Sequence, residues 1–135
     1  MGGRISRNIN LTIQLNHPSY YTKQFLYAET DYQDINSRKF PRNFIVTMTS
    51  KFSILRSLVI LAHEMVHVKQ FAIGELRWPE KYTYPKWQGK ILDYENTEYW
   101  DLPYEIEAHG RERGLVYQWC DDKQLWNKSW YREIF

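Results

Sequence analysis

Two histidines and one glutamate stand at a spacing that suits metal chemistry. His63, Glu64 and His67 form a His-Glu-x-x-His motif inside an apolar run that is typical of a helix. Residues four apart on a helix project to nearly the same side, so His63 and His67 can offer two imidazole nitrogens to one zinc ion. Glu64 stands about 60° from His67 around the helix, beside the metal, where a general base for an activated water belongs.

The competing interpretation is a pair of core histidines and a buried glutamate that share this spacing by chance. Such a motif arises by chance in roughly a few chains per thousand of this length. Here it is flanked by the apolar residues 59–61 and Val68, and an unpaired Glu64 would be costly to bury among them. We therefore favour a metal site.

The composition indicates one globular domain spanning residues 1–135. Hydrophobic residues make up 43% of the chain and charged residues 25%, and the net charge of +2 is too small to indicate nucleic acid binding. Cys120 is the only cysteine, which excludes an intramolecular disulfide framework and a cysteine-based zinc cluster. With no stretch of roughly 18 apolar residues and no apolar signal segment, we expect a soluble cytoplasmic protein without membrane contacts.

Four segments have clear secondary-structure patterns. Residues Ile9–Leu15 alternate apolar and polar side chains, which predicts a half-buried strand, and the β-branched segment Phe44–Thr49 predicts a second one. The motif helix should span Phe52–Ile73, and a second helix should span Asp101–Cys120. These elements predict an α+β fold in which a small antiparallel or mixed sheet packs on the motif helix, with a second ligand-bearing helix.

The ends of the helices and the intervening loops carry weaker signals. Ser50 or Ser53 can cap the first helix and Gly74 can end it, while Asp101 can cap the second helix. Within the second helix we expect Gly110 and Gly114 to allow close packing against another element.

Three further segments are harder to assign. Residues Tyr20–Tyr32 fit a helix or a strand, and Tyr82–Tyr84 with Lys90–Leu92 fit a short hairpin. Of the tryptophans near this hairpin we expect packing roles, and we expect the aromatic tail Asp121–Phe135 to dock on the body of the protein.

A third zinc ligand must come from outside the motif helix, and the second helix offers candidates. His109 and Glu112 both lie within roughly 40° of Glu105 around that helix, whereas Glu107 points about 200° from Glu105. Glu105 and Glu107 therefore cannot both face the metal, and we take Glu107 as the solvated one.

The two helices together resemble the gluzincin metallopeptidases. The resemblance covers Val59–Gln70, with the His-Glu-x-x-His motif, and Asp101–Arg113, with Pro-x-Glu-x-Glu-Ala, and it extends to small metallopeptidases of phage and bacterial type. In gluzincins two histidines of one helix and a glutamate of a second helix hold zinc. The resemblance implies that Zn²⁺ is held by His63, His67 and Glu105.

One position departs from the gluzincin pattern. The second family motif has the form Glu-x-x-x-Asp, and His109 stands where the aspartate is expected. His109 could therefore bind zinc itself or stabilise an oxyanion. The metzincin pattern fails, because Gln70 and Ile73 occupy the positions of its glycine and third histidine.

These observations predict a zinc-dependent peptidase that acts on a peptide or protein substrate. Glu64 would take a proton from the attacking water and deliver it to the leaving amine. A zinc-binding regulatory or phage assembly module without catalysis is the alternative, and the intact Glu64 weighs against it. A DNA-associated factor is a third possibility, which the near-neutral charge weakens.

Overall fold

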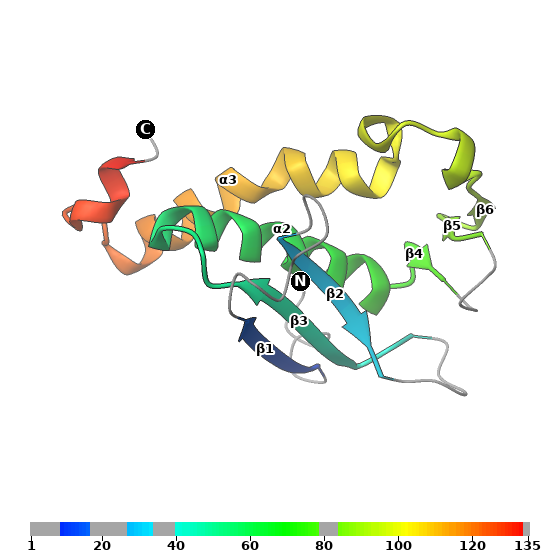
Figure 1. Cartoon of the computed structure of the whole chain (residues 1–135), viewed down its shortest axis with the longest axis horizontal. Coiled ribbons are helices and arrows are strands. Elements are labelled where there is room, and N and C mark those ends of the chain that lie inside the picture. Colours follow the sequence, from blue (N-terminus) through cyan, green and yellow to red (C-terminus); the bar gives the residue numbers. More distant parts are fainter. Residues whose placement is uncertain (1–8, 17–26, 34–39, 79–83, 134–135) are drawn as a thin grey trace.

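The computed structural model describes residues 9–16, 27–33, 40–78 and 84–133. Its larger sheet has the strand order β1-β3-β2, with β1 (Asn10–Asn16) parallel and β2 (Ala28–Tyr32) antiparallel to the central β3 (Asn43–Thr49). Helix α2 (Ile54–Ala72) lies between this sheet and helix α3 (Pro103–Lys123) (Figure 1). The predicted α+β class, with a mixed sheet packed on the motif helix, is confirmed.

Strand β3 supplies the sheet side of the main core. Phe44, Val46 and Met48 alternate along it and are at most 2% exposed, and they share a cluster with Val68 and Phe71 of α2. The predicted strand over Phe44–Thr49 is confirmed, and its β-branched residues suit a central strand that pairs with a neighbour on each side. The motif helix is thereby fixed against the middle of the sheet.

The edge strands are less buried than β3. In β1 the apolar face is covered only at its start, because Ile9 and Leu11 pack on the core while Ile13 and Leu15 are 46% and 64% exposed. The strand is confirmed, but the expectation that it is half-buried throughout is wrong. In the ambiguous segment Tyr20–Tyr32, the part from Ala28 onward forms strand β2, and residues 17–26 lie outside the described residues.

Helix α2 begins and ends with local signals that the sequence contains. The Ser53 hydroxyl accepts a hydrogen bond from the Arg56 N–H at the first turn, so Ser53 and not Ser50 is the cap. After the helix, Gly74 adopts a φ of +80°, and the ring of Phe40 occupies the space that a Cβ would need. Glycine is required there for both reasons.

Helix α3 departs from two expectations. Asp101 lies in the 3₁₀ turn η3 (Tyr99–Asp101), and Leu102 precedes α3 without a side-chain cap, so the predicted capping role of Asp101 is wrong. Gly110 and Gly114 are exposed, and no heavy atom lies within 4 Å of a Cβ built on either. Their predicted close-packing role is also wrong, because they lie on the solvent side of the helix.

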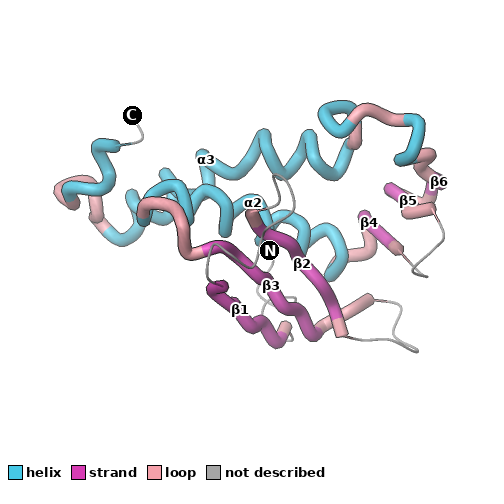
Figure 2. The backbone as a smooth tube through the Cα atoms, in the orientation of Figure 1, coloured by secondary structure: helices cyan, strands magenta, loops and turns pink. Residues whose placement is uncertain are grey.

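A small second sheet lies between the two helices in the chain. It consists of β4 (Leu76–Arg77), β5 (Lys86–Trp87) and β6 (Lys90–Ile91), and lies at the opposite end of the molecule from the C-terminal turn η4 (Ser129–Glu133) (Figure 2). The hairpin therefore pairs Lys86–Trp87, and not the predicted Tyr82–Tyr84, with Lys90–Ile91. Positive φ angles of 49° at Gln88 and 83° at Gly89 form its tight turn. Tyr82 and Thr83 lie outside the described residues.

The tryptophans of this region divide into two groups. Trp78 and Trp87 pack against the main core, as expected, whereas Trp100 is 69% exposed. A 3₁₀ turn η2 (Tyr94–Asn96) separates the hairpin from η3. Within the described residues, none of the helices combines the length and the apolar character needed to cross a bilayer.

A second apolar cluster joins the far ends of the two helices. Leu55 of α2 contacts Val116 and Cys120 of α3, and Trp130 and Tyr131 of the C-terminal segment pack against them. The predicted docking of the tail is confirmed for its described part. This cluster holds the helices together at a distance from the motif histidines.

The thiol of Cys120 should report on the integrity of this cluster. Cys120 has no exposed surface, and burial raises its thiol pKa. Because only the exposed thiolate reacts, we expect Cys120 to react with a chromogenic disulfide reagent at least about a hundredfold more slowly in the folded protein than in denaturant. Rapid labelling of the native protein, with its circular dichroism unchanged, would contradict this packing.

Candidate metal centre

Three candidate ligand residues from two helices come together at one point. The Nε2 atoms of His63 and His67 lie 3.1 Å apart, one oxygen of Glu105 lies 3.0 Å from the first, and its other oxygen lies 3.3 Å from the second. Tetrahedral zinc has ligands at about 2.0–2.1 Å, which places neighbouring ligand atoms roughly 3.3 Å apart. The observed separations therefore suit one zinc ion held by these three residues.

The other ring nitrogen of each histidine is bound to an acceptor. His67 Nδ1 lies 2.8 Å from Gln70 Oε1, and the Gln70 amide nitrogen donates to the Tyr104 carbonyl and to Glu107. Because those two partners only accept, the Gln70 oxygen must face His67, and His67 Nδ1 must carry the proton. The Nε2 of His67 is then the nitrogen available to a metal.

Glu112 accepts a hydrogen bond from the other ring nitrogen of His63, as Gln70 does for His67. Its Oε2 lies 2.9 Å from His63 Nδ1, and since a carboxylate only accepts, Nδ1–H is the donor. In the gluzincin pattern the expected aspartate lies four residues after the ligand glutamate. Here a glutamate seven residues after Glu105, two helical turns along the same face, contacts the ligand histidine in its place.

The charges around the three candidate ligands favour a cation between them. Burial lowers the pKa of His63 and of His67, but the hydrogen bonds and charges of their neighbours, Glu105 foremost, together outweigh burial and raise both. Burial likewise raises the pKa of Glu105, yet the hydrogen bonds from the two histidines hold it well below its usual range. Each Nε2 therefore takes either a proton or a metal ion, and the buried carboxylate favours both.

Glu64 lies beside the three ligands, as the motif spacing predicts. Its side chain accepts a hydrogen bond from the Thr30 hydroxyl of strand β2. Burial raises the Glu64 pKa, and the Thr30 hydrogen bond and the two histidines offset this only in part. A carboxylate with increased proton affinity, held by the sheet and lining a cavity with His63, is suited to accept a proton.

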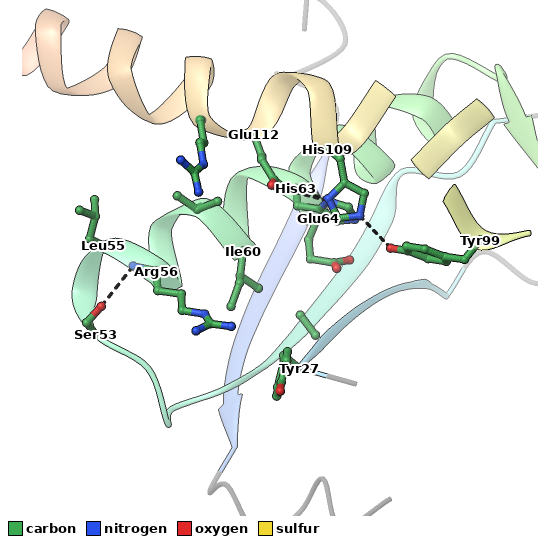
Figure 3. A pocket seen from close by; sticks show the side chains of 13 residues that line it. Tyr27, Ser53, Leu55, Arg56, Ile60, His63, Glu64, Tyr99, His109 and Glu112 are labelled. Carbon is green, nitrogen blue, oxygen red and sulfur yellow. Dashed lines mark hydrogen bonds and ion pairs between the residues drawn. The ribbon is translucent and has the colours of Figure 1, made fainter. Parts of the chain in front are cut away.

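His109 lies at the edge of the centre. Its Nε2 is 3.0 Å from the Tyr99 hydroxyl (Figure 3). The same Nε2 is 3.9 Å from Glu105, and the Tyr99 hydroxyl is 2.8 Å from Glu105. The hydroxyl must donate to the Glu105 carboxylate, so His109 Nε2–H is the donor to Tyr99. One ligand atom each from His63, Glu105 and His109 also lies within 4.8 Å of the others, so His109 stays a candidate ligand.

Glu107 points away from the ligands, as expected, but its surroundings differ from the prediction. It was expected to be solvated, yet its side chain is only 19% exposed. It accepts hydrogen bonds from Gln70 and Lys69 and pairs with Arg111 at 3.3 Å. Glu107 therefore contributes to the site indirectly, because it holds the amide that orients His67.

The sequence analysis named Glu112 only as a possible ligand, and it did not identify three other contributors, Gln70, Thr30 and Tyr99. Gln70 follows His67 by three residues, so helical spacing could have indicated it. Thr30 carries no such signal, because its position depends on how the sheet packs on α2. Tyr99 lies outside both motifs and is recognisable only from the fold.

Glu112 should contribute to zinc affinity without binding the ion. We expect Glu112→Ala to weaken zinc binding by roughly ten- to a hundredfold, because His63 loses the acceptor that sets its tautomer and orientation. Competition with a chromophoric chelator measures this. Asp122→Ala, an exposed acid on the same helix, is the matched control and should bind zinc as the wild type does. Equal affinity in the two variants would contradict this role.

The comparisons with known proteins add no identity to this geometry. The chain matches no protein-family model, no curated protein and no solved structure. The gluzincin resemblance accordingly depends on the two motifs and on the arrangement of His63, His67, Glu105 and Glu64 alone.

Proposed function

We propose that the protein is a zinc-dependent peptidase. The observation that carries the proposal is the convergence of His63 Nε2, His67 Nε2 and a Glu105 carboxylate within 3.0–3.3 Å of one another. A structural zinc site usually has four protein ligands, whereas three ligands leave a position for water and substrate. The adjacent Glu64 supports catalysis further, because a purely structural site needs no base.

The residues around the ligands have distinct tasks in this proposal. Bound zinc supplies a Lewis acid that polarises the peptide carbonyl and lowers the pKa of water. The Glu64 carboxylate, oriented by Thr30, accepts the proton of the attacking water and then gives it to the leaving nitrogen. Glu64 thus gains one proton and loses one proton in each cycle, and it ends as a carboxylate.

Tyr99 is the best-placed group to stabilise negative charge on the carbonyl oxygen. It lines, with His63, Glu64 and His109, a cavity of about 640 Å³. Burial and the Glu105 carboxylate raise its pKa above the usual range, so the hydroxyl keeps its proton. This proton is donated to Glu105 and would have to turn towards the carbonyl oxygen to stabilise charge there. His109 donates to the same hydroxyl and so orients it.

Strand β2 offers a binding mode for an extended peptide. It is an edge strand, since β3 is its only partner among the described strands, and its Thr30 contacts Glu64 directly. A peptide added along its free edge would make main-chain hydrogen bonds and bring its carbonyl groups past the base. This mode explains how so small a protein could hold a substrate.

A peptide-library digest tests the proposal. Zinc-loaded protein should cleave library peptides, chelation should abolish cleavage, and added zinc should restore it. His63→Ala from the same purification controls for contaminating proteases and should be inactive. If the zinc-loaded wild type cleaves nothing that His63→Ala leaves intact, the enzyme proposal fails, and zinc binding without turnover would favour a regulatory or assembly module.

A further inference from the structure

The cavity at the metal centre continues well beyond it. From His63 and Glu64 it runs along α2 towards the start of that helix, where Ser53 and Arg56 line it (Figure 3). On the α3 side it is lined by Arg113. The cavity thus carries two cationic side chains, Arg56 near the start of α2 and Arg113 on α3, that the hydrolytic chemistry does not use.

Helical spacing places Arg56 on the same side of α2 as the zinc ligands. Arg56, Ile60 and His63 stand at positions i, i+4 and i+7, and Figure 3 shows Arg56 and Ile60 projecting from one side of the helix. Seven residues correspond to about 10 Å along the axis. An extended peptide rises roughly 3.3 Å per residue, so Arg56 faces a position about three residues from the metal.

The guanidinium of Arg56 is held by aromatic rings. It lies 4.1 Å from the ring centroid of Phe52 and 5.9 Å from that of Tyr27, and these two rings pack edge to face. Stacking fixes the plane of a guanidinium while it leaves the N–H groups at its edge free to donate. Arg56 is therefore oriented in advance for a planar acceptor.

Arg56 and Arg113 also differ in their pairing from Lys69 and Arg111 of the same two helices. Lys69 and Arg111 pair with Glu107, at 3.2 and 3.3 Å. Among the described residues, neither Arg56 nor Arg113 has a carboxylate within 4 Å. Two cations without an acidic partner in one cavity favour an anionic ligand.

We propose that this cavity binds a substrate carboxylate about three residues from the scissile bond, with Arg56 and Arg113 as its donors. The proposal rests on the peptidase function and names its substrate class: peptides with an acidic side chain at that position, or with their C-terminal carboxylate there. Glu64 and Glu112 line the same cavity and would repel a polyanion, so a singly charged carboxylate fits better than a nucleic acid backbone.

Binding and cleavage of matched peptides test the proposal separately. The binding arm uses zinc-loaded Glu64→Gln protein and fluorescence anisotropy of labelled peptides that carry Glu or Gln at one position, with a free or amidated C-terminus. Two peptides carry the test carboxylate, one in a Glu side chain and one at a free C-terminus. We expect whichever of them binds more tightly to bind about tenfold more tightly than its matched neutral peptide. The Glu/Gln pair and the acid/amide pair distinguish the two sources of the carboxylate.

Substitutions of the two arginines test whether their side chains cause the preference for a carboxylate. Arg56→Gln and Arg113→Gln should each remove most of the preference for the carboxylate, while binding of the neutral peptide stays within about twofold. Arg111→Gln is the matched control, because it removes an exposed arginine two residues from Arg113 that pairs with Glu107, and it should keep the preference. In the cleavage arm, the wild type should show the same preference in kcat/KM.

Three results would overturn the proposal: equal affinity for carboxylate and neutral peptides, a preference that survives both arginine substitutions, or tighter binding of a short single-stranded oligonucleotide at the same arginines. Failure of the peptidase function gives a different pattern. In that case the wild type cleaves no peptide. The anisotropy measurements still test the carboxylate site, because they show whether carboxylate peptides bind more tightly and whether Arg56→Gln removes that difference.

Discussion

Replacing Glu64 with glutamine should abolish most peptidase activity while the protein keeps its zinc. Glutamine preserves the size of the side chain and can still accept the Thr30 hydrogen bond, but it cannot take up a proton. Loss of a general base lowers the rate by about a hundred- to ten-thousandfold. The three proposed ligands His63, His67 and Glu105 are unchanged, so metal analysis should find as much zinc in Glu64→Gln as in the wild type.

The control for this comparison is Glu98→Gln. Glu98 is an exposed glutamate outside the cavity lining, and its replacement should leave kcat/KM within about twofold. A Glu64→Gln protein that keeps its zinc and hydrolyses peptides within about threefold of the wild type would reject Glu64 as the base.

Replacing Glu105 should affect zinc affinity much more than replacing His109. The Glu105 carboxylate lies 3.0 Å from His63 Nε2 and 3.3 Å from His67 Nε2. His109 Nε2 is 3.9 Å from that carboxylate and donates a hydrogen bond to the Tyr99 hydroxyl. We expect Glu105→Ala to weaken zinc binding more than about a hundredfold, and His109→Ala by roughly ten- to a hundredfold at most. Competition with a chromophoric chelator measures both.

The converse result would change the ligand assignment. If His109→Ala loses the metal while Glu105→Ala retains it, His109 binds zinc with His63, and Glu105 is the residue that orients them. The ligand atoms of His63, Glu105 and His109 lie close enough for that arrangement to be a real competitor.

Local sequence signals were sufficient for the elements that carry the motif. The β-branched segment of β3, the Ser53 cap and the φ-positive Gly74 are all properties of short stretches, and the structure contains them where they were predicted. The close approach of His63 and His67 follows from four-residue spacing alone. Glu105 was selected by the family pattern and lies against both histidines.

Several of the errors and omissions involve contacts between elements. Gly110 and Gly114 were assigned to an interface because glycine is costly in a helix, but helical phase places them in solvent. Thr30 reaches Glu64 only because β2 pairs antiparallel to β3 and lies across α2. Such tertiary placements have no periodic signature in the chain, so they could be identified only in the folded protein.

Zinc stoichiometry tests the central claim most directly. Protein incubated with zinc, freed of excess metal and analysed by inductively coupled plasma mass spectrometry should contain about one zinc per chain, as three converging ligands require. A variant with both His63→Ala and His67→Ala should contain almost none, with its helical circular dichroism retained. The account is contradicted if the wild type retains no zinc after loading, or if the double variant retains as much as the wild type.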